Sequence, residues 1–505
     1  MKRMILAAVL AVAVHGVAVA DSDAVAAARS YRKANDARIL RDFADLLAIP
    51  NVAARPGELR RTAVAIRDGL ASRGVSAELL EIDGVPPIVY GRLDAPGAER
   101  TLGIYVHYDG QPVDPSQWSH PPFEPRLYTA PVDRGGRSRP FPEAEEAIDP
   151  EWRISARGAG DDKAPLGAIF PALDALRAAG IPRTSNLVFF FEGEEEAGSD
   201  HLSDYMAAHR EKIDPVDLWL ICDGPVHQSR RPQLVFGVRG YTGIDITVYG
   251  AERYLHSGHY GNWAPNPAHD LARLLATMKD DQGRVLIEGF YDSVAPLTES
   301  ERQALAEVPD VDEELRLELG LARSEGVGSL VERIQMPSLN IRGIASATVG
   351  SSARNIVPIR AEVSIDVRLV KGNDPAGMLD LVERHVTAQG YHIVRDKPDH
   401  ATRLAHPRIA RVVRRPGYPA VRTSMDLEIV EPVIEAASRA AGESVVLMPT
   451  LGGSLPLYLF TEQLQRPLVI VPIANHDDNQ HAPDENLRLA NLWYGIDLFA
   501  ALFTM

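Results

Sequence analysis

The chain has 505 residues, which is too long for one hydrophobic core, so two domains are expected. Its hydrophobic content of 45% and charged content of 24% are ordinary for a globular protein. The formal net charge of −16 argues against a nucleic-acid partner, because the sequence has no basic stripe that could neutralise phosphates.

The first twenty residues have the pattern of a targeting segment. Lys2 and Arg3 precede an apolar run over Met4–Val14, and Ala18-Val19-Ala20 offers a small-residue cleavage site. This pattern predicts a signal peptide over residues 1–20 and a secreted or periplasmic protein. The alternative is an uncleaved membrane anchor, although the run is short for a bilayer span. No later segment reaches spanning length, so no membrane contact is expected after cleavage.

Two helices are predicted at the start of the mature chain. Residues 29–47 place Leu40, Phe43 and Leu47 at helical spacing, and a second helix is predicted over residues 59–73.

Strand-like apolar runs then alternate with helices. A helix is predicted over residues 163–179, and the apolar runs lie at 103–106, 186–191, 218–222 and 468–471. Near-continuous apolar runs suit strands that are covered on both faces of a parallel sheet. In such sheets, ligands bind outside the carboxyl ends of the strands.

A different pattern occupies residues 237–403, where apolar and polar residues alternate as on half-buried strands. The predicted elements are a strand at 244–248, a helix at 266–279, strands near 339–344 and at 361–369, a helix at 375–388 and a strand near 391–394. This β-α-β-β-α-β order is that of a ferredoxin-like domain. The predicted fold class is therefore α/β, with a mainly parallel sheet flanked by helices over residues 21–236 and 404–505, and an inserted ferredoxin-like α+β domain.

Metal-ligating residue types lie in five short segments, four of which directly follow apolar runs. They are His107, Asp161, Glu195, Glu196, Asp223 and His481. Neutral imidazoles and carboxylates are ligands of zinc, and a spare carboxylate beside them suits metal-assisted hydrolysis. The sequence therefore predicts a two-metal hydrolase.

His107 and Asp109 are two residues apart, so a strand end points both side chains the same way. Asp109 can then hold the second ring nitrogen of a metal-binding His107 and fix its tautomer. A histidine after a strand is also a common structural group, so this pair alone does not distinguish a metal ligand from a structural histidine.

The loop over residues 157–163 is glycine-rich and enters a helix. It can be a phosphate cradle or a capping turn, but no six-residue glycine fingerprint is present. The functional interpretation makes Asp161 a carboxylate that spans two cations.

Four glutamates lie within Glu192–Glu196, directly after a buried strand, where uncompensated carboxylates are costly. A metal ion would compensate them, so that one glutamate ligates and its neighbour acts as a general base. Asp223 can be a ligand, an N-cap or a turn residue. Either His476 or His481 is expected to be a ligand, and the spacing alone does not choose between them.

These segments, in this order, resemble the dizinc metallopeptidase family that includes carnosinases, aminoacylase and succinyl-diaminopimelate desuccinylase. The resemblance extends over nearly the whole mature chain. Its motifs are His107 to Pro112, Gly158 to Lys163, Glu192 to Ser199 and His481 to Asn486.

The resemblance implies the role of each site residue. His107 and Asp223 would hold one zinc ion, Glu196 and His481 the other, and Asp161 would bridge the two. Glu195 would be the general base, and Asp109 would orient His107.

The inserted domain carries further motifs of the family, so it would serve as a dimerisation and lid domain over residues 237–403. His256, in Leu255-His256-Ser257-Gly258, resembles the histidine that reaches the neighbouring subunit's site in dimeric members. Two further positions of this domain resemble substrate-contacting residues, Asn355 and Arg368, and Arg368 would bind a substrate carboxylate. Ser454, which lies after this domain in the sequence, also resembles a substrate-contacting residue.

The expected function is hydrolysis of peptide bonds in dipeptides or short peptides by a metal-activated water. Each subunit is expected to bind two Zn²⁺, with Mn²⁺ or Co²⁺ as alternatives, and the protein is expected to form a homodimer. An N-acyl-amino-acid deacylase with the same metal chemistry is the nearer alternative. A non-catalytic periplasmic metal- or solute-binding protein is the more distant one.

Overall fold

The computed structural model describes residues 15–53, 55–144 and 146–505. The chain divides into two compact units. The first contains Met1–Phe236, Thr423–Met448 and Leu459–Met505, and the second contains Gly237–Arg422 and Pro449–Tyr458.

The first unit is built on an eight-stranded sheet. In spatial order its strands are β1 (Ser76–Leu80), β2 (Ile88–Leu93), β7 (Asn186–Glu192), β3 (Thr101–His107), β8 (Leu218–Ile221), β20 (Leu468–Ile470), β9 (Gln233–Val235) and β19 (Val446–Met448). The central run β7-β3-β8-β20 is parallel, whereas β1-β2-β7 and β20-β9 are antiparallel. The predicted mainly parallel sheet is confirmed, and its central strands are the apolar runs of the sequence.

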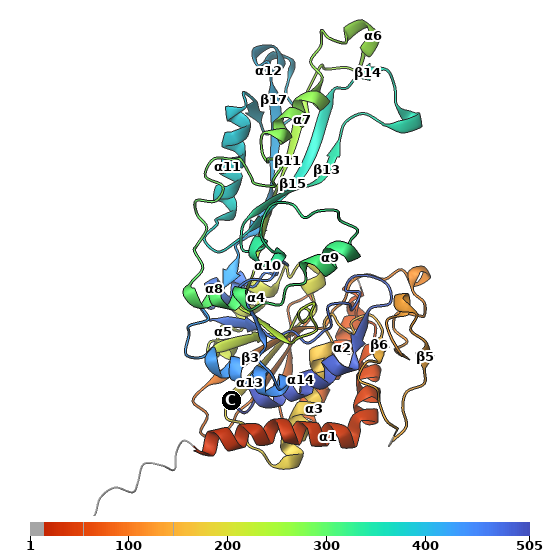
Figure 1. The fold of residues 1–505 in the computed structure, drawn as a ribbon, viewed down its shortest axis with the longest axis vertical. Coiled ribbons are helices and arrows are strands. Elements are labelled where there is room, and N and C mark those ends of the chain that lie inside the picture. The colour runs from red at the N-terminus through yellow and green to blue at the C-terminus, as the bar shows by residue number, and fades with distance from the viewer. Residues whose placement is uncertain (1–14, 54, 145) are drawn as a thin grey trace, which may run out of the picture. The chain divides into compact units, whose positions relative to one another are not determined.

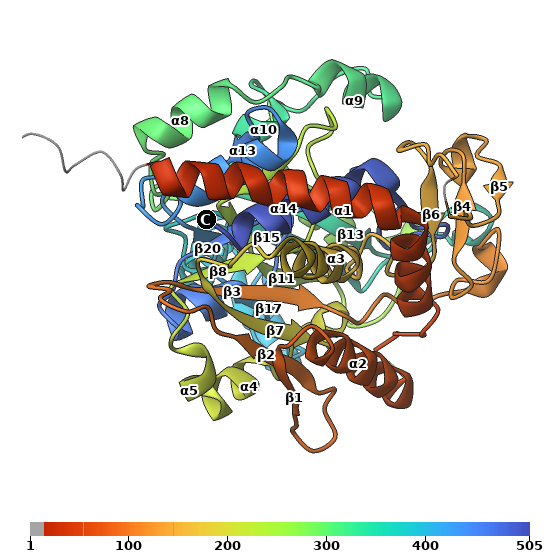
Figure 2. The same ribbon diagram turned by 90° about the horizontal axis from the view of Figure 1, so that it is seen from below.

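Helices cover this sheet. They are α1 (His15–Leu47), α2 (Pro56–Ala71), α3 (Ala164–Ala179), α4 (Leu202–Ala208), α5 (Arg210–Ile213), α13 (Glu431–Ala441) and α14 (Leu489–Leu502). Helices α1, α3 and α14 pack side by side (Figure 2), and their apolar side chains share one core with the central strands. Burial on both faces explains why these strands lack an alternating pattern.

A small antiparallel sheet joins two distant parts of the first unit. Its order is β21 (Asn486–Arg488), β6 (Arg153–Ser155), β4 (Arg126–Tyr128) and β5 (Ser138–Arg139). Because Asn486 pairs with Ser155, the loop that follows β6 lies beside the loop that precedes β21. These loops carry Asp161 and His481.

The second unit contains a five-stranded sheet (Figure 1). Its order is β13 (Ser338–Ala345), β15 (Arg360–Leu369), β11 (Gly240–Tyr249), β17 (Ile409–Tyr418) and β16 (His392–Val394). Its helices are α6 (Ser257–Tyr260), α7 (Pro267–Ala276), α8 (Glu299–Ala306), α9 (Asp312–Glu318), α10 (Leu330–Arg333), α11 (Pro375–Ala388) and α12 (His400–Ala405). Short ladders join β12 (Leu255–His256) to β14 (Ile356–Val357) and β10 (Gly237–Val238) to β18 (Val421–Arg422).

The ferredoxin-like order is present, but its fourth strand is β17 and not the predicted strand near residues 391–394. That segment forms β16, a short edge strand parallel to β17. The predicted boundary at residue 404 is therefore too early, because β17 pairs along β11 and belongs to the second unit. Residues 449–458 join this unit as well.

The predicted signal peptide covers residues 1–20, of which residues 1–14 lie outside the described residues. The predicted cleavage site at Ala18–Ala20 falls within α1. No helix among the described residues has the length and hydropathy needed to cross a bilayer.

Candidate metal centre

The predicted ligands lie at one edge of the first unit's sheet. His107 is the last residue of β3, Glu195 and Glu196 lie in the turn η3 (Glu195–Ala197) after β7, and Asp223 follows β8. Since β7, β3 and β8 are parallel neighbours, their carboxyl ends meet at this edge. The sequence therefore brings these side chains together by strand order alone.

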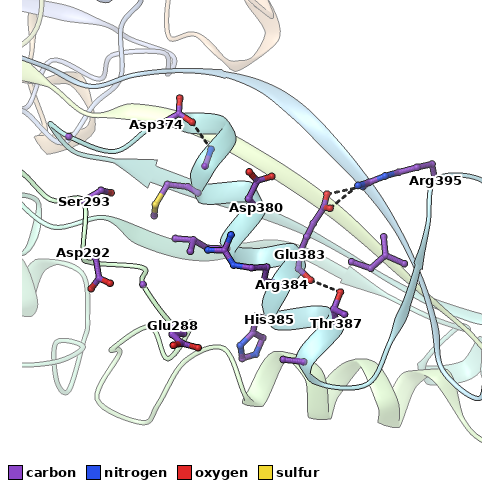
Figure 3. Close-up of a pocket in the computed structure, with 17 residues that line it drawn as sticks. Glu288, Asp292, Ser293, Asp374, Asp380, Glu383, Arg384, His385, Thr387 and Arg395 are labelled. Atoms are coloured by element: carbon purple, nitrogen blue, oxygen red, sulfur yellow. Dashed lines mark hydrogen bonds and ion pairs between the residues drawn. The ribbon is translucent and has the colours of Figure 1, made fainter.

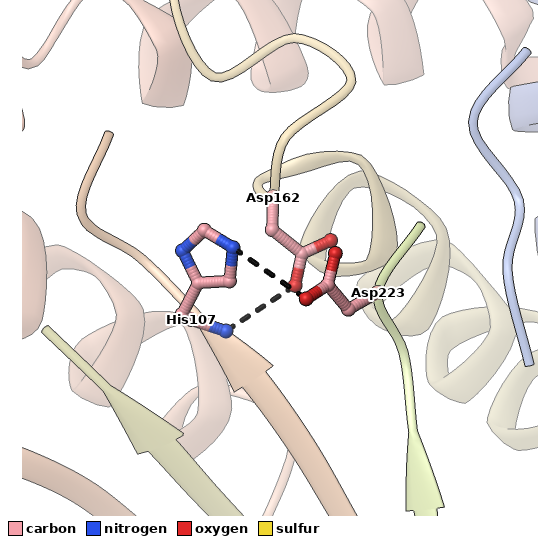
Figure 4. Close-up of side chains that lie close together, drawn as sticks. All are labelled: His107, Asp162 and Asp223. Carbon is pink, nitrogen blue, oxygen red and sulfur yellow. Dashed lines mark hydrogen bonds and ion pairs between the residues drawn. The ribbon is translucent and has the colours of Figure 1, made fainter. Parts of the chain in front are cut away.

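One group of potential ligands consists of His107, Asp162 and Asp223, all buried, with one ligand atom from each within 4.8 Å of the others. His107 Nε2 lies 4.0 Å from Asp223 Oδ2. The backbone N–H of His107 donates to Asp162 Oδ2 over 3.2 Å. Figure 4 shows the two carboxylates facing the imidazole.

A second group consists of Asp161, Glu196 and His481. His481 Nε2 lies 3.1 Å from Asp161 Oδ2 and 3.3 Å from Glu196 Oε2. The His481 side chain is 53% exposed, whereas those of Asp161 and Glu196 are 5% and 4% exposed. The second group therefore has one side open to an incoming molecule.

Asp161 links the two groups. Its Oδ1 lies 2.9 Å from His107 Nε2, and its Oδ2 faces His481. One carboxylate thus presents an oxygen to each histidine, which is the arrangement that a ligand shared by two cations requires.

Asp109 connects His107 to the glutamate turn. Its Oδ1 lies 3.4 Å from His107 Nδ1. Its carboxylate also accepts the backbone N–H groups of Glu195 and Glu196, over 3.2 and 3.0 Å. Asp109 is fully buried, so it fixes the imidazole and the turn with respect to one another.

Glu195 belongs to neither group of potential ligands. Its Oε2 lies 4.0 Å from His107 Nε2, and its side chain is 14% exposed. A carboxylate in this position is beside the candidate ligands and remains available for proton transfer.

Burial of so many acids changes their protonation. Burial raises the pKa of Glu195 and of Asp162 well above the ordinary range, and raises the pKa of Asp223 to about 6. Burial also opposes charge on Asp161, but hydrogen bonds from His107 and His481 outweigh it and hold the pKa of Asp161 far below its usual value. The hydrogen bonds of His481 to Asp161 and Glu196 raise its pKa to about 10.

The residues present fit divalent metal ions. Two imidazoles and several buried carboxylates are the donor set that zinc accepts, and positive charge would offset the cost of burying these acids. Among the residues that the structure describes, these two groups each bring three potential ligand atoms within 4.8 Å of one another.

Some members of the site were not found from the sequence. The sequence pattern assigns no role to Asp162, yet this residue groups with His107 and Asp223. Gln480 Nε2 donates to Asp161 Oδ2 over 2.8 Å, and Gln111 Nε2 donates to Glu196 Oε2 over 2.7 Å. Gln111 lies within a predicted motif and Gln480 directly precedes another, but nothing in an amide side chain marks it as part of a metal site.

His256, Asn355 and Arg368 lie in the second unit, and so does Ser454, which lies outside the predicted bounds of the inserted domain. The four residues form two pairs. His256 is in β12, next to β14, and the backbone N–H of Ser257 donates to the carbonyl of Asn355 over 3.0 Å. Arg368 Nη1 donates to Ser454 Oγ over 2.7 Å, and the guanidinium lies 5.4 Å from the ring centre of Tyr241.

The second unit also contains a cavity of about 1340 Å³ beside α11 (Figure 3). Its wall includes the carboxylates of Glu288, Asp292 and Asp380 and the basic side chains of Arg384 and Arg395. None of the predicted site residues lines it.

Comparison with known proteins shows which family the chain matches. Residues 103–505 match peptidase family M20/M25/M40. The Cys-Gly metallodipeptidase dug1 of Schizosaccharomyces pombe is 30% identical over 82% of this chain and 82% of its own length. The mouse Beta-Ala-His dipeptidase is 27% identical over 86% of this chain and 85% of its own length.

Solved structures agree in fold. The M20 family metallo-carboxypeptidase Sso-CP2 of Sulfolobus solfataricus has a TM-score of 0.72 at 29% identity and covers 92% of this chain and 98% of its own. The dipeptidase Dug1p of Saccharomyces cerevisiae also has a TM-score of 0.72, at 23% identity, over 96% of this chain and 98% of its own.

The predicted secreted or periplasmic location is wrong. It was inferred from the N-terminal pattern alone, and the yeast Cys-Gly metallodipeptidases that this chain resembles over most of its length are intracellular. A charged start followed by a short apolar run is therefore insufficient evidence of export in this chain.

Proposed function

The chain belongs to peptidase family M20/M25/M40 and is a metal-dependent dipeptidase, and from this premise we propose how its residues carry out the reaction. The observation that carries the proposal is the position of Asp161, whose two carboxylate oxygens face His107 and His481. We assign Asp161 as the ligand shared by two divalent ions, which we propose to be zinc.

The remaining ligands follow from the two groups. His107 and Asp223 would hold one ion, and Glu196 and His481 the other. Asp162 lies in the first group, where it accepts the backbone N–H of His107 and so supports the ligand loop. When bound, such ions polarise a carbonyl group and increase the acidity of water.

Proton transfer is assigned to Glu195. Its carboxylate lies beside His107 and outside both ligand groups, so it can accept a proton from the attacking water and later donate it to the leaving amine. Asp109 holds the glutamate turn through two backbone N–H groups, and it thereby positions the base.

Substrate binding is assigned to the second unit. Arg368 would bind the carboxylate of the dipeptide, since a guanidinium forms paired hydrogen bonds with a carboxylate. Ser454 Oγ accepts from Arg368 and restricts its orientation. His256 ends β12, and Asn355 directly precedes β14, the strand that pairs with β12. From this position His256 would stabilise the developing oxyanion.

We propose that the protein forms a homodimer through β13. This strand is at the edge of the second unit's sheet, and its Ile341 and Ile344 side chains are 44% and 60% exposed. An open edge with exposed isoleucines is a surface that a second strand can cover. His256 would then act in the site of the partner subunit.

The deacylase alternative is not favoured, because the relatives that match over most of the chain are named dipeptidases. The test is to remove metal with a chelator, restore it with zinc, and compare dipeptides with N-acyl amino acids as substrates. The proposal expects dipeptide hydrolysis that disappears and returns with zinc. Faster cleavage of N-acyl amino acids would overturn the substrate assignment.

A further inference from the structure

Glu485 is hydrogen-bonded to the loop that carries Asp161, and the predicted motifs give it no role. It lies four residues after His481, and its side chain is 0% exposed. Burial raises the pKa of Glu485, and the neighbouring Arg157 opposes this rise. A carboxylate is costly to bury in this way unless hydrogen bonds compensate it.

Both oxygens of this carboxylate accept hydrogen bonds from the Asp161 loop. Oε1 accepts the backbone N–H groups of Gly160 and Asp161, over 2.8 and 2.9 Å. Oε2 accepts the backbone N–H of Gly158 over 2.9 Å and Arg157 Nη1 over 2.6 Å. Four donors from five consecutive residues therefore converge on one side chain.

The contact also fixes the spacing of two chain segments. Glu485 belongs to the loop that carries His481, whereas its donors belong to the loop that carries Asp161. The backbone N–H of Ala156 donates to the Glu485 carbonyl over 3.2 Å, next to the pairing of β6 with β21. Main chain and side chain of Glu485 thus join the same two loops.

We propose that Glu485 is a positioning residue for both metal ions. It binds the N–H of Asp161, the residue whose carboxylate faces His107 on one side and His481 on the other. Displacement of Asp161 would disturb both ligand groups together, whereas loss of a ligand from one group disturbs that group first. This inference rests on the metal assignment proposed above.

The test is zinc affinity, measured by competition between a chelator and the metal-free protein. Glu485→Gln keeps the size of the side chain but replaces one acceptor oxygen with an N–H₂ group that faces N–H donors. We expect zinc to bind both sites about 10- to 100-fold more weakly, as for other residues that orient metal ligands. Glu485→Asp restores a carboxylate and is expected to recover part of this loss.

Asp174→Asn is the matched control. Asp174 is also a buried carboxylate of the first unit, and it accepts from Arg73 and Arg177. This variant is expected to lower the unfolding midpoint and leave zinc affinity unchanged. All affinities are compared well below the unfolding midpoints, so that loss of fold is not counted as loss of metal.

The outcomes separate the two proposals. If the unsubstituted protein binds fewer than two zinc ions, the metal assignment itself fails. If it binds two ions and Glu485→Gln retains both affinities, Glu485 serves only stability and the positioning role is overturned. Should Glu485→Gln fail to fold, Glu485→Asp replaces it in the test. Weaker zinc binding at both sites would then support the positioning role, and unchanged zinc binding would overturn it.

Discussion

Glu195 and Glu196 are adjacent, yet the structure separates them. Glu196 contacts His481 and joins a ligand group, whereas Glu195 lies near His107 without joining either group. Both backbone N–H groups bind Asp109, so one buried carboxylate orients the turn that makes this division. The division is the physical basis for assigning one glutamate to the metal and the other to proton transfer.

Replacing Glu195 with Gln is expected to lower kcat by about 10²–10⁴-fold, the usual contribution of a general base. The two bound ions should remain, because no ligand is removed. Metal content by mass spectrometry and kcat on a dipeptide would be measured on the same sample. A variant with two ions and nearly normal kcat would reject Glu195 as the base.

His107, the pair Glu195–Glu196 and Asp223 could be predicted as ligand candidates because each follows a recognisable buried strand. The division of work between Asp161 and Asp162 could not be predicted from their pattern. Two adjacent carboxylates in a glycine-rich loop are equivalent in composition, and only the loop's backbone decides which one faces His481 and which one approaches Asp223.

At the scale of elements, β3 depends on a residue without a side chain. Gly103 lies in the centre of the sheet, between β7 and β8, and a Cβ at this position would overlap the ring of Trp219. Trp219 is fully buried and cannot move outward. Gly103 is therefore required for close approach of β3 and β8.

Gly103→Ala is expected to lower the free energy of unfolding by about 1–3 kcal/mol, the usual cost of overpacking a core. Gly57→Ala is the control, because Gly57 lies in α2 with no atom within 4 Å of the added Cβ. The control should be neutral or stabilising by up to about 1 kcal/mol. Urea unfolding would measure both, and equal stabilities would contradict the packing argument.

Helix α11 is joined to its sheet by Glu383. Hydrogen bonds from Arg395 at 2.7 Å and from Arg414 at 2.8 Å lower the pKa of Glu383 to about 2. A carboxyl whose pKa is lower when folded adds stability above its unfolded pKa, about 4.3. This contribution is lost as the pH falls from about 4.3 towards 2.

Glu383→Gln is expected to lower the free energy of unfolding at pH 7 by about 1 kcal/mol, a modest value because the arginines are partly exposed to solvent. The difference between the two proteins should shrink as the pH is lowered towards 2. Urea unfolding at pH 7 and pH 2.5 would measure it. A difference of the same size at both pH values would show that the ion pairs are not its source.

The same region shows why the end of the inserted domain could not be placed from the sequence. The strand β17 contains Arg411, Arg414 and Arg415, so its composition does not suggest a buried strand. Its alternate residues Ala410 and Val412 are buried against the core of the second unit, and Arg414 pairs with α11. Partners distant in the sequence make this segment a strand.

At the scale of the whole molecule, the chain leaves its first unit, forms a second, and returns. The division into two units was predictable, because two hydrophobic patterns occupy separate stretches of sequence. The return of residues 449–458 to the second unit could not be predicted, since this short segment has no hydrophobic pattern of its own. The segment includes Ser454, the partner of Arg368.

Ile344→Lys is expected to convert the proposed dimer to a monomer, because it places charge on the exposed edge of β13. Light scattering after size-exclusion chromatography would measure the mass. A monomeric unsubstituted protein, or a variant that remains dimeric, would contradict the proposed interface.

A mixing experiment tests whether His256 acts across that interface. His256→Ala and Glu195→Gln subunits should each be inactive alone. Random mixing should recover on the order of a quarter of normal activity, since half the dimers then contain one complete site. No recovery in dimers shown to have exchanged subunits would mean that His256 does not act in the partner's site.

The proposed reaction depends most on two cations held around Asp161, and anomalous X-ray scattering from crystals grown with zinc locates them directly. Two peaks are predicted, one beside His107 and Asp223 and the other beside Glu196 and His481, with Asp161 between them. A single peak, or peaks away from these side chains, would contradict it.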